Sequence, residues 1–459
     1  MTASSPLKTI IQMKKIFIYL LVGVFSITAC KKENNTILAD PDERLIEILK
    51  NYKQTLTEAS NGWIASLYPS GGGGYSFYID FDEKDRVIML SDFNSESSTE
   101  AFESTYRLKA LQRPTLIFDT YNYIHLLADP DESLNGGEKG LGLKSDFEFA
   151  FLKLVQDSIY FEGTFNKNKM ELRAASAEEK EAILSGAWNK MIDNTTSFLN
   201  QSKHSYLTLG DERKLALDIN PQKKSLLLSW LTDDGKAMST SANYRYTQDG
   251  IVFDKALIYD GKSFDSMFWN EEKSEYYVKI NNENFSLKTS QTPIMPMYTL
   301  FGFGKDWTQL EIIGETLSPG IPSSFNSVFA DYINRFRTSS TTGRKVLYTR
   351  LDFGSIDQAV LTVRYVALDA SGNNTGSEFS ATITYDYTMV NDIVTLKEAS
   401  LNGNWNTRAN QLLPLREYFA NRSFRVDWVN NPDLTSTNYI GGLYLTSDAS
   451  SFFYGMLNK

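Results

Sequence analysis

Two kinds of segment recur along this sequence of 459 residues and set its organisation. The segments "YRYTQDGIVFDKA" from Tyr244 and "YDYTMVNDIVTLKEA" from Tyr385 share Tyr-x-Tyr-Thr, an Asp-containing turn and Ile-Val, and "TYRLKALQRPTLIFD" is a looser copy. The tyrosines before each turn, Tyr106, Tyr246 and Tyr387, are 140 and 141 residues apart. Each copy reads as strand, polar turn and strand, the pattern of a β-hairpin. Chance resemblance among hairpins is the alternative to a true repeat.

A second hairpin pattern precedes each copy and is marked by a central aspartate. Asp80, Asp218 and Asp352 take similar places in the segments that begin "FYIDFDEK", "KLALDINP" and "LYTRLDFG". The chain also carries 25 Tyr, 28 Phe and 7 Trp, and aromatic residues favour the half-buried faces of sheets. The hairpins and this composition predict a β-rich protein of the α+β class.

An amphipathic helix is expected at the start of each repeat. Asp40 is a capping residue followed by Pro41 at the first helical position, and Ser176 with Glu179 has the pattern of a capping box. A third helix is expected near residue 324, where apolar residues recur at helical spacing. We therefore predict three divergent units, each of one helix plus antiparallel strands, over residues 41–175, 176–318 and 319–459.

The N-terminal segment has the pattern of a secretory signal peptide. Two lysines precede an uncharged apolar run that ends at Ala29 and is shorter than the ~20 residues of a membrane-spanning helix. We predict that residues 1–29 are removed. Residues 1–12 are expected to be a start-site extension, because Met13 begins a more usual signal sequence.

Cys30 is the single cysteine of the chain and directly follows this run. The ending Ile27-Thr28-Ala29-Cys30 resembles a bacterial lipobox. In that signal the peptide is cut before the cysteine and the thiol carries diacylglycerol. The resemblance implies a lipidated cysteine and polar tether over residues 30–40, with acylated Cys30 inserted in the lipid bilayer. The alternatives are an ordinary signal peptide with a chance cysteine, or a buried thiol.

Charge and residue counts argue against several classes of function. The formal charge is −10, the pI is about 5.0 and no long basic run is present, which argues against nucleic-acid binding. One cysteine cannot form an intrachain disulfide. The chain has two histidines and contains neither the HExxH nor the CxxC pattern of zinc sites. The chain also lacks a nucleophile elbow with a plausible histidine partner. We therefore predict no metal, no cofactor and no enzymatic activity.

Four stretches carry a resemblance to a known family. They are "NGWIASLYP" from Asn61, "GGYSFYIDF" from Gly73, "FDTYNYIHLLADP" from Phe118 and "GLGLKSDFEF" from Gly140. They resemble an uncharacterised Bacteroidota lipoprotein family called domain of unknown function 4302. The resemblance implies no enzymatic activity. It implies an outer-membrane lipoprotein, on the cell surface or the periplasmic face, that accompanies a transporter complex for glycans or other nutrients.

The segment "FDTYNYIHLL" supplies the candidate binding residues. As a strand it would place Asp119, Tyr121, Tyr123 and His125 on one face. Such a face can stack a sugar ring and hydrogen-bond its hydroxyls. The alternative is that this face packs against the helix of the unit. Trp63 lies beside turn-like residues and is a further candidate contact for a ligand.

Three other segments have weaker signals. Asp146 and Glu148 share a strand face, but neighbours on one strand rarely straddle a scissile bond, so a structural role is favoured. "DPDESLNGGEKG" from Asp129 fails the EF-hand pattern and is expected to be a flexible loop. "SGGGGY" from Ser70 lacks the ending of a phosphate loop and is expected to be a mobile hairpin tip.

Three functions are compatible with the sequence. The first is a non-enzymatic lipoprotein that binds a glycan or peptide ligand for a nutrient-uptake system. The second is a structural or interaction subunit of an outer-membrane complex. The third is a hydrolase, which no motif supports. Exposure of Tyr121, Tyr123 and the tryptophans discriminates between the first two, because a binding platform has to be accessible.

Overall fold

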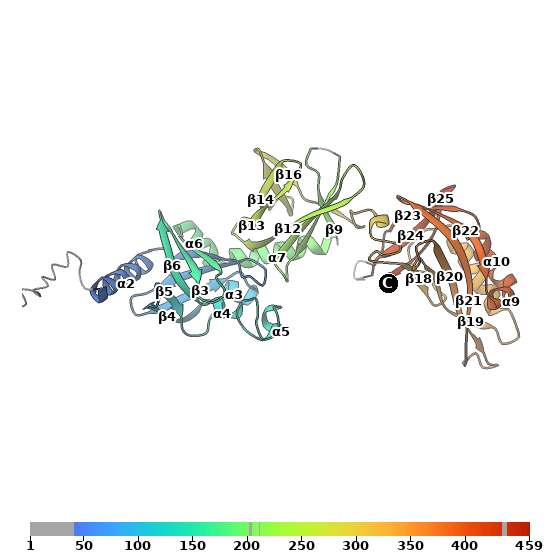
Figure 1. The fold of residues 1–459 in the computed structure, drawn as a ribbon, viewed down its shortest axis with the longest axis horizontal. Coiled ribbons are helices and arrows are strands. Elements are labelled where there is room, and N and C mark those ends of the chain that lie inside the picture. The colour runs from blue at the N-terminus through green and yellow to red at the C-terminus, as the bar shows by residue number, and fades with distance from the viewer. Residues whose placement is uncertain (1–40, 202–203, 211, 434–437) are drawn as a thin grey trace, which may run out of the picture.

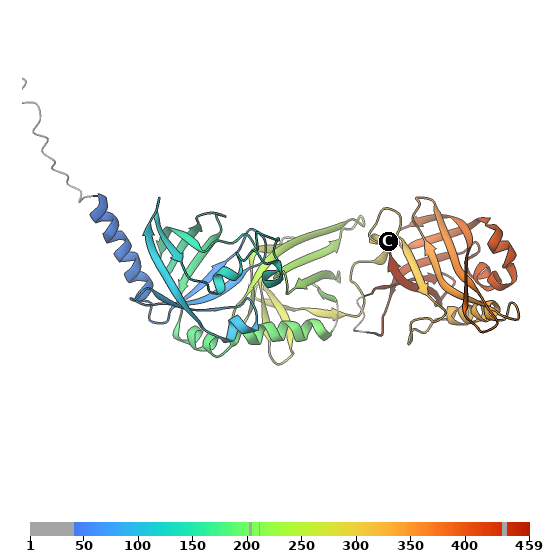
Figure 2. The same ribbon diagram turned by 90° about the horizontal axis from the view of Figure 1, so that it is seen from below.

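Three antiparallel sheets follow one another along the long axis of the molecule in the computed structural model (Figures 1 and 2). The structure describes residues 41–201, 204–210, 212–433 and 438–459. The predicted signal peptide, the tether and the lipid attachment at Cys30 lie outside the described residues. The fold is β-rich and of the α+β class, as the sequence predicted.

The first sheet is a closed barrel of eight strands, in which β1 pairs with both β2 and β8. Its core is filled by inward side chains such as Phe77, Phe118 and Phe149. The helix α2 packs on the barrel, with the Tyr52 ring 3.7 Å from the Phe151 ring between centroids. The elements are α2 Pro41–Thr57, β1 Trp63–Leu67, β2 Tyr75–Phe81, β3 Arg86–Ser91, α3 Ser95–Thr99, β4 Phe102–Ala110, β5 Pro114–Phe118, α4 Tyr123–Leu126, α5 Glu132–Asn135, β6 Glu148–Val155, β7 Ser158–Gly163 and β8 Lys169–Ala174.

The second sheet has nine strands, and its last strand, β17, returns to pair with its first, β9. The predicted capping box of Ser176 and Glu179 is present at the start of α6. The helix α7 buries Trp188 and Phe198 in the core of this sheet. The elements are α6 Ala177–Leu184, α7 Ala187–Gln201, β9 His204–Leu207, β10 Leu215–Asn220, β11 Ser225–Leu231, β12 Ala237–Tyr246, β13 Gly250–Tyr259, β14 Lys262–Asn270, β15 Glu275–Ile280, β16 Glu283–Ser286 and β17 Lys288–Ser290.

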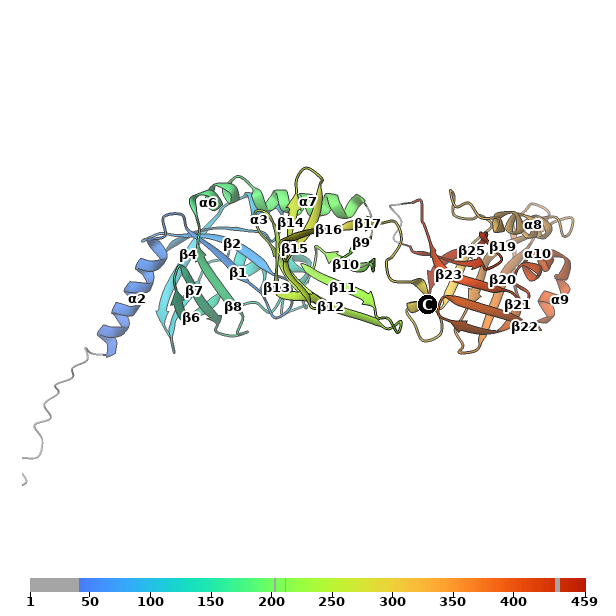
Figure 3. The same cartoon turned by 90° about the horizontal axis from the view of Figure 1, so that it is seen from above.

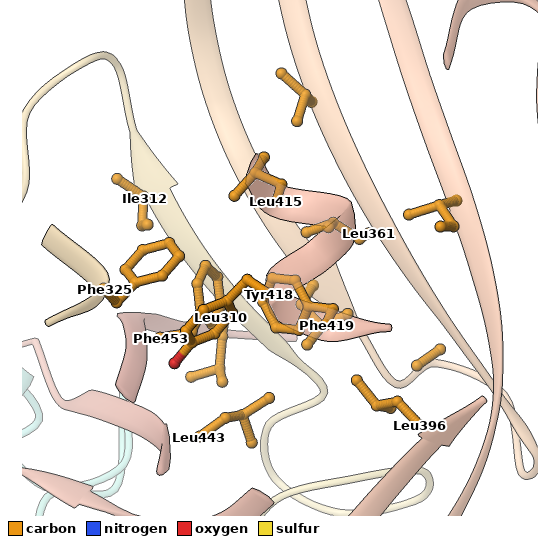
Figure 4. Close-up of a cluster of buried hydrophobic side chains, with 14 of the residues drawn as sticks. Leu310, Ile312, Phe325, Leu361, Leu396, Leu415, Tyr418, Phe419, Leu443 and Phe453 are labelled. Atoms are coloured by element: carbon orange, nitrogen blue, oxygen red, sulfur yellow. The ribbon is translucent and has the colours of Figure 1, made fainter. Parts of the chain in front are cut away.

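The third sheet is again a closed barrel of eight strands, and β18 closes it by pairing with β25. Side chains of α8 and α10, including Phe325, Tyr418 and Phe419, meet Leu310 and Phe453 of the strands in one core (Figure 4). The elements are the 3₁₀ helix η1 Met297–Thr299, β18 Gln309–Ile313, α8 Phe325–Arg337, β19 Arg344–Asp352, β20 Gln358–Leu368, β21 Asn374–Val390, β22 Ile393–Leu401, α9 Gly403–Thr407, α10 Ala409–Phe419, β23 Ser423–Val429, β24 Ile440–Leu445 and β25 Asp448–Asn458.

The repeated hairpins occupy equivalent strands of the three sheets. The aspartate hairpins form the second and third strands of each unit, and the tyrosine hairpins form the fourth and fifth. Two details of the predicted units are wrong. Each unit carries more than one helix, and β18 precedes α8, so the third barrel begins before residue 319. The loop-like stretch before α8 lies within this barrel, because closure of the barrel requires β18 beside β25.

Strand β2 belongs both to the first barrel and to the junction with the second sheet. Phe77 and Ile79 line the barrel core, whereas Tyr78 on the opposite face joins the core of the second unit. Burial of both faces explains why apolar residues occur on both faces of β2. The helix α6 lies beside the first barrel and α7 beside the second sheet (Figures 2 and 3).

The glycine-rich segment packs into the same junction. The Gly73 amide donates to the side-chain oxygen of Asn243 at 3.2 Å. A Cβ on Gly74 would lie 2.4 Å from the Tyr68 ring and 2.8 Å from the Tyr244 carbonyl oxygen. The prediction of a mobile hairpin tip is therefore wrong. Glycine is required here because the two units approach so closely.

An ion pair between Asp92 and Lys224 lies at the centre of this junction. The Lys224 Nζ is 2.7 Å from Asp92 Oδ1, and the Lys224 and Asp92 side chains are 4% and 0% exposed. Asp92 also accepts the backbone amides of Ser76, at 2.9 Å, and Tyr246, at 2.7 Å. The ammonium lies 4.6 Å above the Tyr75 ring centroid. One carboxylate thus holds a strand of the first barrel and a strand of the second sheet.

Lys224 has an unfavourable backbone conformation in the turn between β10 and β11. Its φ is 45°, and a left-handed backbone at a non-glycine residue costs about 1–3 kcal/mol. Burial lowers the pKa of Lys224 to about 8, and the attraction of Asp92 offsets only part of that effect. The side chain therefore remains charged at neutral pH and depends on Asp92 as its counterion.

Replacing one partner of this pair is expected to destabilise the first two units strongly. Lys224→Met keeps the backbone strain and much of the side-chain length but leaves the Asp92 carboxylate buried without a counterion. A broken buried pair costs about 3–5 kcal/mol, measurable as a lower urea midpoint. The double variant Asp92→Asn/Lys224→Met removes both charges and should lose less than Lys224→Met alone. A wild-type urea midpoint for Lys224→Met would contradict this role.

Candidate functional site

The segment that follows β5 forms a turn and a short helix instead of the predicted strand. β5 ends at Phe118, and α4 covers Tyr123–Leu126. Asn122 caps this helix by accepting the Ile124 amide at 3.1 Å. Asparagine strongly favours the cap position, and this local hydrogen bonding overrides the alternation of the sequence. The predicted common strand face of Asp119, Tyr121, Tyr123 and His125 is therefore wrong.

The turn nevertheless brings three aromatic rings together in a stack. The rings of Tyr121 and His125 are 5.6 Å apart between centroids with an interplanar angle of 24°. The rings of His125 and Phe147 are 4.8 Å apart at 28°. Tyr121 is 52% exposed and Phe147 is 40% exposed. These three residues, called the aromatic stack below, form an accessible ring surface on the first barrel.

Hydrogen bonds fix the orientation of the stack. The His125 Nε2 is 3.1 Å from the Phe118 carbonyl oxygen, and its Nδ1 is 3.2 Å from the Asn122 amide nitrogen. The Tyr121 hydroxyl donates to Asp129 at 2.9 Å. Burial and this bond raise the pKa of Tyr121 to about 12. Both outer rings are neutral at physiological pH, which suits contact with the apolar face of a sugar or a peptide side chain.

Phe147 is the residue of the stack that the sequence did not indicate. It precedes β6, and its carbonyl oxygen accepts the Phe118 amide at 3.1 Å. This link across β5 and β6 places it beside His125. The pairing joins segments about thirty residues apart, so no local pattern could have identified it.

The other candidate residues have structural partners. Asp119 accepts the Thr105 hydroxyl at 2.6 Å and forms an ion pair with Arg107. Tyr123 is 8% exposed, and its hydroxyl donates to the Glu100 carbonyl at 2.8 Å. Trp63 is 3% exposed and lies in the barrel core. Tyr121 and His125 are thus the two predicted site residues that lie in the aromatic stack.

Three other tryptophans, Trp269, Trp405 and Trp428, offer little accessible surface. Trp405 and Trp428 are buried, and Trp269 is half-buried with its Nε1 donating to Glu271 at 2.9 Å. The accessible platform is therefore made by the aromatic stack instead of by these indole rings.

Asp146 organises a turn of the chain. It is buried and accepts the backbone amides of Phe165 and Asn166 at 2.9 and 2.8 Å, and the Asn168 side chain at 2.9 Å. These hydrogen bonds fix the carboxylate in the turn. The pair with Glu148 is therefore structural, as the sequence favoured.

The segment from Asp129 is tied down by its own side chains. Asn135 donates to the carbonyl oxygens of Leu126 and Asp129 at 2.8 and 2.9 Å, and Asp131 accepts the Ser133 amide at 2.9 Å. These bonds form α5 and hold Asp129 beside Tyr121. The segment is a hydrogen-bonded turn, and the prediction of a flexible loop is wrong. Within the described ranges, no group of three or more His, Cys, Asp or Glu side chains is arranged to hold a metal ion.

His125 is expected to be neutral at pH 7. Burial lowers its pKa below the ordinary 6.5, although its backbone hydrogen bonds and Asp119 act in the opposite direction. Because the pKa is lowered by folding, the stability that neutral His125 contributes is present above pH ~6.5 and is lost as the pH falls through the folded value. The His125 ring signals in an NMR titration should have a midpoint below 6.5. A His204→Gln variant assigns the signals, and a midpoint at or above 6.5 would contradict this environment.

No helix in the described part of the chain is long and apolar enough to cross a membrane.

Comparison with solved structures finds several remote likenesses, two of them to transferrin binding protein B. One is the isotype 1 transferrin binding protein B from serogroup B Neisseria meningitidis, at 11% identity and a TM-score of 0.11 over 84% of this chain. The other is the Trp-176-Ala mutant of transferrin binding protein B from Haemophilus parasuis Hp5, at 12% identity and a TM-score of 0.11, again over 84% of this chain. This chain spans 66% and 64% of those proteins. At such scores the likeness supports no inference about fold or function.

Comparison by sequence identifies the family. No curated protein matches this chain significantly. A family model described as "Domain of unknown function (DUF4302)" matches residues 33–271, which span the first barrel and most of the second sheet. Since this match covers more than half of the 459 residues, the chain belongs to the family of domain of unknown function 4302.

Proposed function

We propose that this protein is an outer-membrane lipoprotein that binds a glycan or peptide ligand for a nutrient-uptake system. It is anchored through acylated Cys30 and has no catalytic role. The observation that carries the proposal is the exposed aromatic stack of Tyr121, His125 and Phe147. Rigid, partly exposed rings provide contact area at little cost in conformational entropy.

The surroundings of the stack support a ligand with both apolar and polar groups. Tyr121 and Phe147 present ring surface, and the Asp129 carboxylate lies 2.9 Å from the Tyr121 hydroxyl. The Asp119–Arg107 pair follows at the end of β5. Sugar rings combine an apolar C–H face with hydroxyls, and peptides combine side chains with backbone amides, so both suit such a surface.

The N-terminal sequence supports the anchor. The lipobox-like ending at Cys30 is separated from α2 by residues 31–40. An extended chain spans at most ~3.6 Å per residue, so such a tether keeps the start of α2 within roughly 40 Å of the lipid. The unit that carries the aromatic stack is therefore the unit nearest the membrane along the chain.

A structural or interaction role is the second candidate, because one hairpin of the first barrel exposes apolar side chains. Leu152, Leu154 and Val155 of β6 are all exposed. Contiguous exposed apolar side chains are typical of surfaces that contact another protein. The hydrolase alternative gains no support, because Asp146 is engaged in structural hydrogen bonds.

Binding and anchoring can be tested with one set of variants. The mature protein is applied to glycan and peptide arrays, and the full-length chain is followed in membrane fractions of an expressing bacterium. Tyr121→Ala/Phe147→Ala should lose at least tenfold in affinity for the ligand that the wild type selects, because the ring surface is removed. Cys30→Ala should leave the membrane fraction.

Phe165→Ala is the matched control, since Phe165 is an exposed aromatic residue of the same barrel outside the stack. It should bind like the wild type. Unchanged binding by the Tyr121→Ala/Phe147→Ala variant would exclude the aromatic stack as the site. Absence of any glycan or peptide binding by the wild type would favour the interaction role.

A further inference from the structure

A crevice of about 220 Å³ lies where the first barrel, the helices α6 and α7 and the second sheet meet. Ile64 and Ser76 line it from the barrel, Trp188 lines it from α7, and Arg245 and Phe268 line it from the second sheet. Interfaces between structural units are common places for small-ligand sites. All of these residues lie within the segment that the family model matches.

Arg245 reaches this junction from β12. Its neighbours Tyr244 and Tyr246 are buried in the core of the second sheet, so the alternation of the strand directs Arg245 toward the first barrel. One guanidinium nitrogen, Nη1, donates to Ser76 Oγ at 3.2 Å, and the Tyr68 hydroxyl is a second polar neighbour. The Nε of Arg245 is buried and has no hydrogen-bond partner among the described residues.

Two acidic side chains, Glu179 and Asp249, line the same crevice as Arg245. The buried carboxylate of the junction, Asp92, is paired with Lys224. Arg173, the other arginine of the crevice, is bound by both oxygens of Glu179 at 3.0 and 2.7 Å. Arg245 is in no ion pair in the part of the chain that the structure describes. A buried N–H without an acceptor is costly, and a ligand carboxylate beside the guanidinium would offset its charge.

The rest of the crevice suits a small ligand with an apolar face. Trp188 and Ile183 are buried, and Phe268 is half-buried, so together they give apolar walls. Thr247 and Gln248 of the β12–β13 turn add polar groups. Sites for drug-sized ligands are about 300–1,000 Å³, so this smaller space fits one sugar ring or one amino acid.

We propose that this crevice binds a small carboxylate-bearing ligand, with Arg245 as the partner of the carboxylate and Trp188 and Phe268 as the walls around the ligand body. The planar guanidinium presents paired donors that match a carboxylate. A uronic acid and an acidic amino acid share this chemistry. The site goes beyond the proposed function, because it is built from residues other than those of the aromatic stack.

The test uses isothermal titration calorimetry on the mature protein with two pairs of probes. D-glucuronate is compared with D-glucose, and N-acetyl-L-glutamate α-amide with N-acetyl-L-glutaminamide, so that the two members of each pair differ in one carboxylate and one member is neutral. At least one carboxylate probe should bind tenfold or more tightly than its neutral partner. The pair that shows this difference identifies the ligand class, a uronic acid or an acidic amino acid. Arg245→Gln should weaken that binding at least tenfold. Arg364→Gln, in β20 of the third barrel, is the matched control and should bind like the wild type.

Arg245→Lys keeps the charge but removes the planar fork, so it should also weaken binding; it serves as the test if Arg245→Gln does not fold. Equal binding of the charged and neutral probes would overturn the proposal, as would wild-type affinity in both Arg245 variants. The Tyr121→Ala/Phe147→Ala variant should retain carboxylate binding. Loss of carboxylate binding in that variant would overturn the assignment to the crevice, whereas array binding tests the aromatic stack separately.

Discussion

The buried ion pair between Asp92 and Lys224 is the interaction on which the arrangement of the first two units depends. Asp92 accepts the amides of Ser76 in the first barrel and Tyr246 in the second sheet while it neutralises Lys224. Burying both charges is expensive, so the pair is stable only where its geometry is fully satisfied. The pair therefore favours one relative position of the two sheets, and the glycine-rich segment and the two-faced strand β2 are compatible with that position.

Both proposed binding sites lie in the region that the family model matches, and one of them depends on this junction. The aromatic stack lies on the first barrel, and the Arg245 crevice exists only while the barrel and the second sheet remain together. The third barrel lies outside the matched region, and its described contacts with the second unit include the ring of Tyr439, which lies 5.6 Å from the ring of His204 in β9 between centroids. The proposed ligand-binding role thus rests on the first two units acting as one body.

Much of the fold could be predicted from the sequence, because capping residues and hairpin patterns act locally. The Ser176 capping box, the helix from Phe325 and the repeated hairpins are all present. One error was local, because the cap at Asn122 replaces the expected strand by a turn. The other arose where distant segments decide the structure, since barrel closure assigns β18 to the third unit. The site was found in part for the same reason: Tyr121 and His125 are close in sequence, whereas Phe147 and Arg245 reach their positions through pairing and packing across the chain.

Native-state hydrogen exchange on the mature protein tests most directly whether the first two units form one body. The amides of Ser76 and Tyr246 both donate to Asp92, one from each unit. Amides that open in one cooperative event share one free energy of opening. The account predicts the same opening free energy for these two amides. A Tyr246 amide that exchanges through a much lower opening free energy, while the Ser76 amide stays protected, would contradict it.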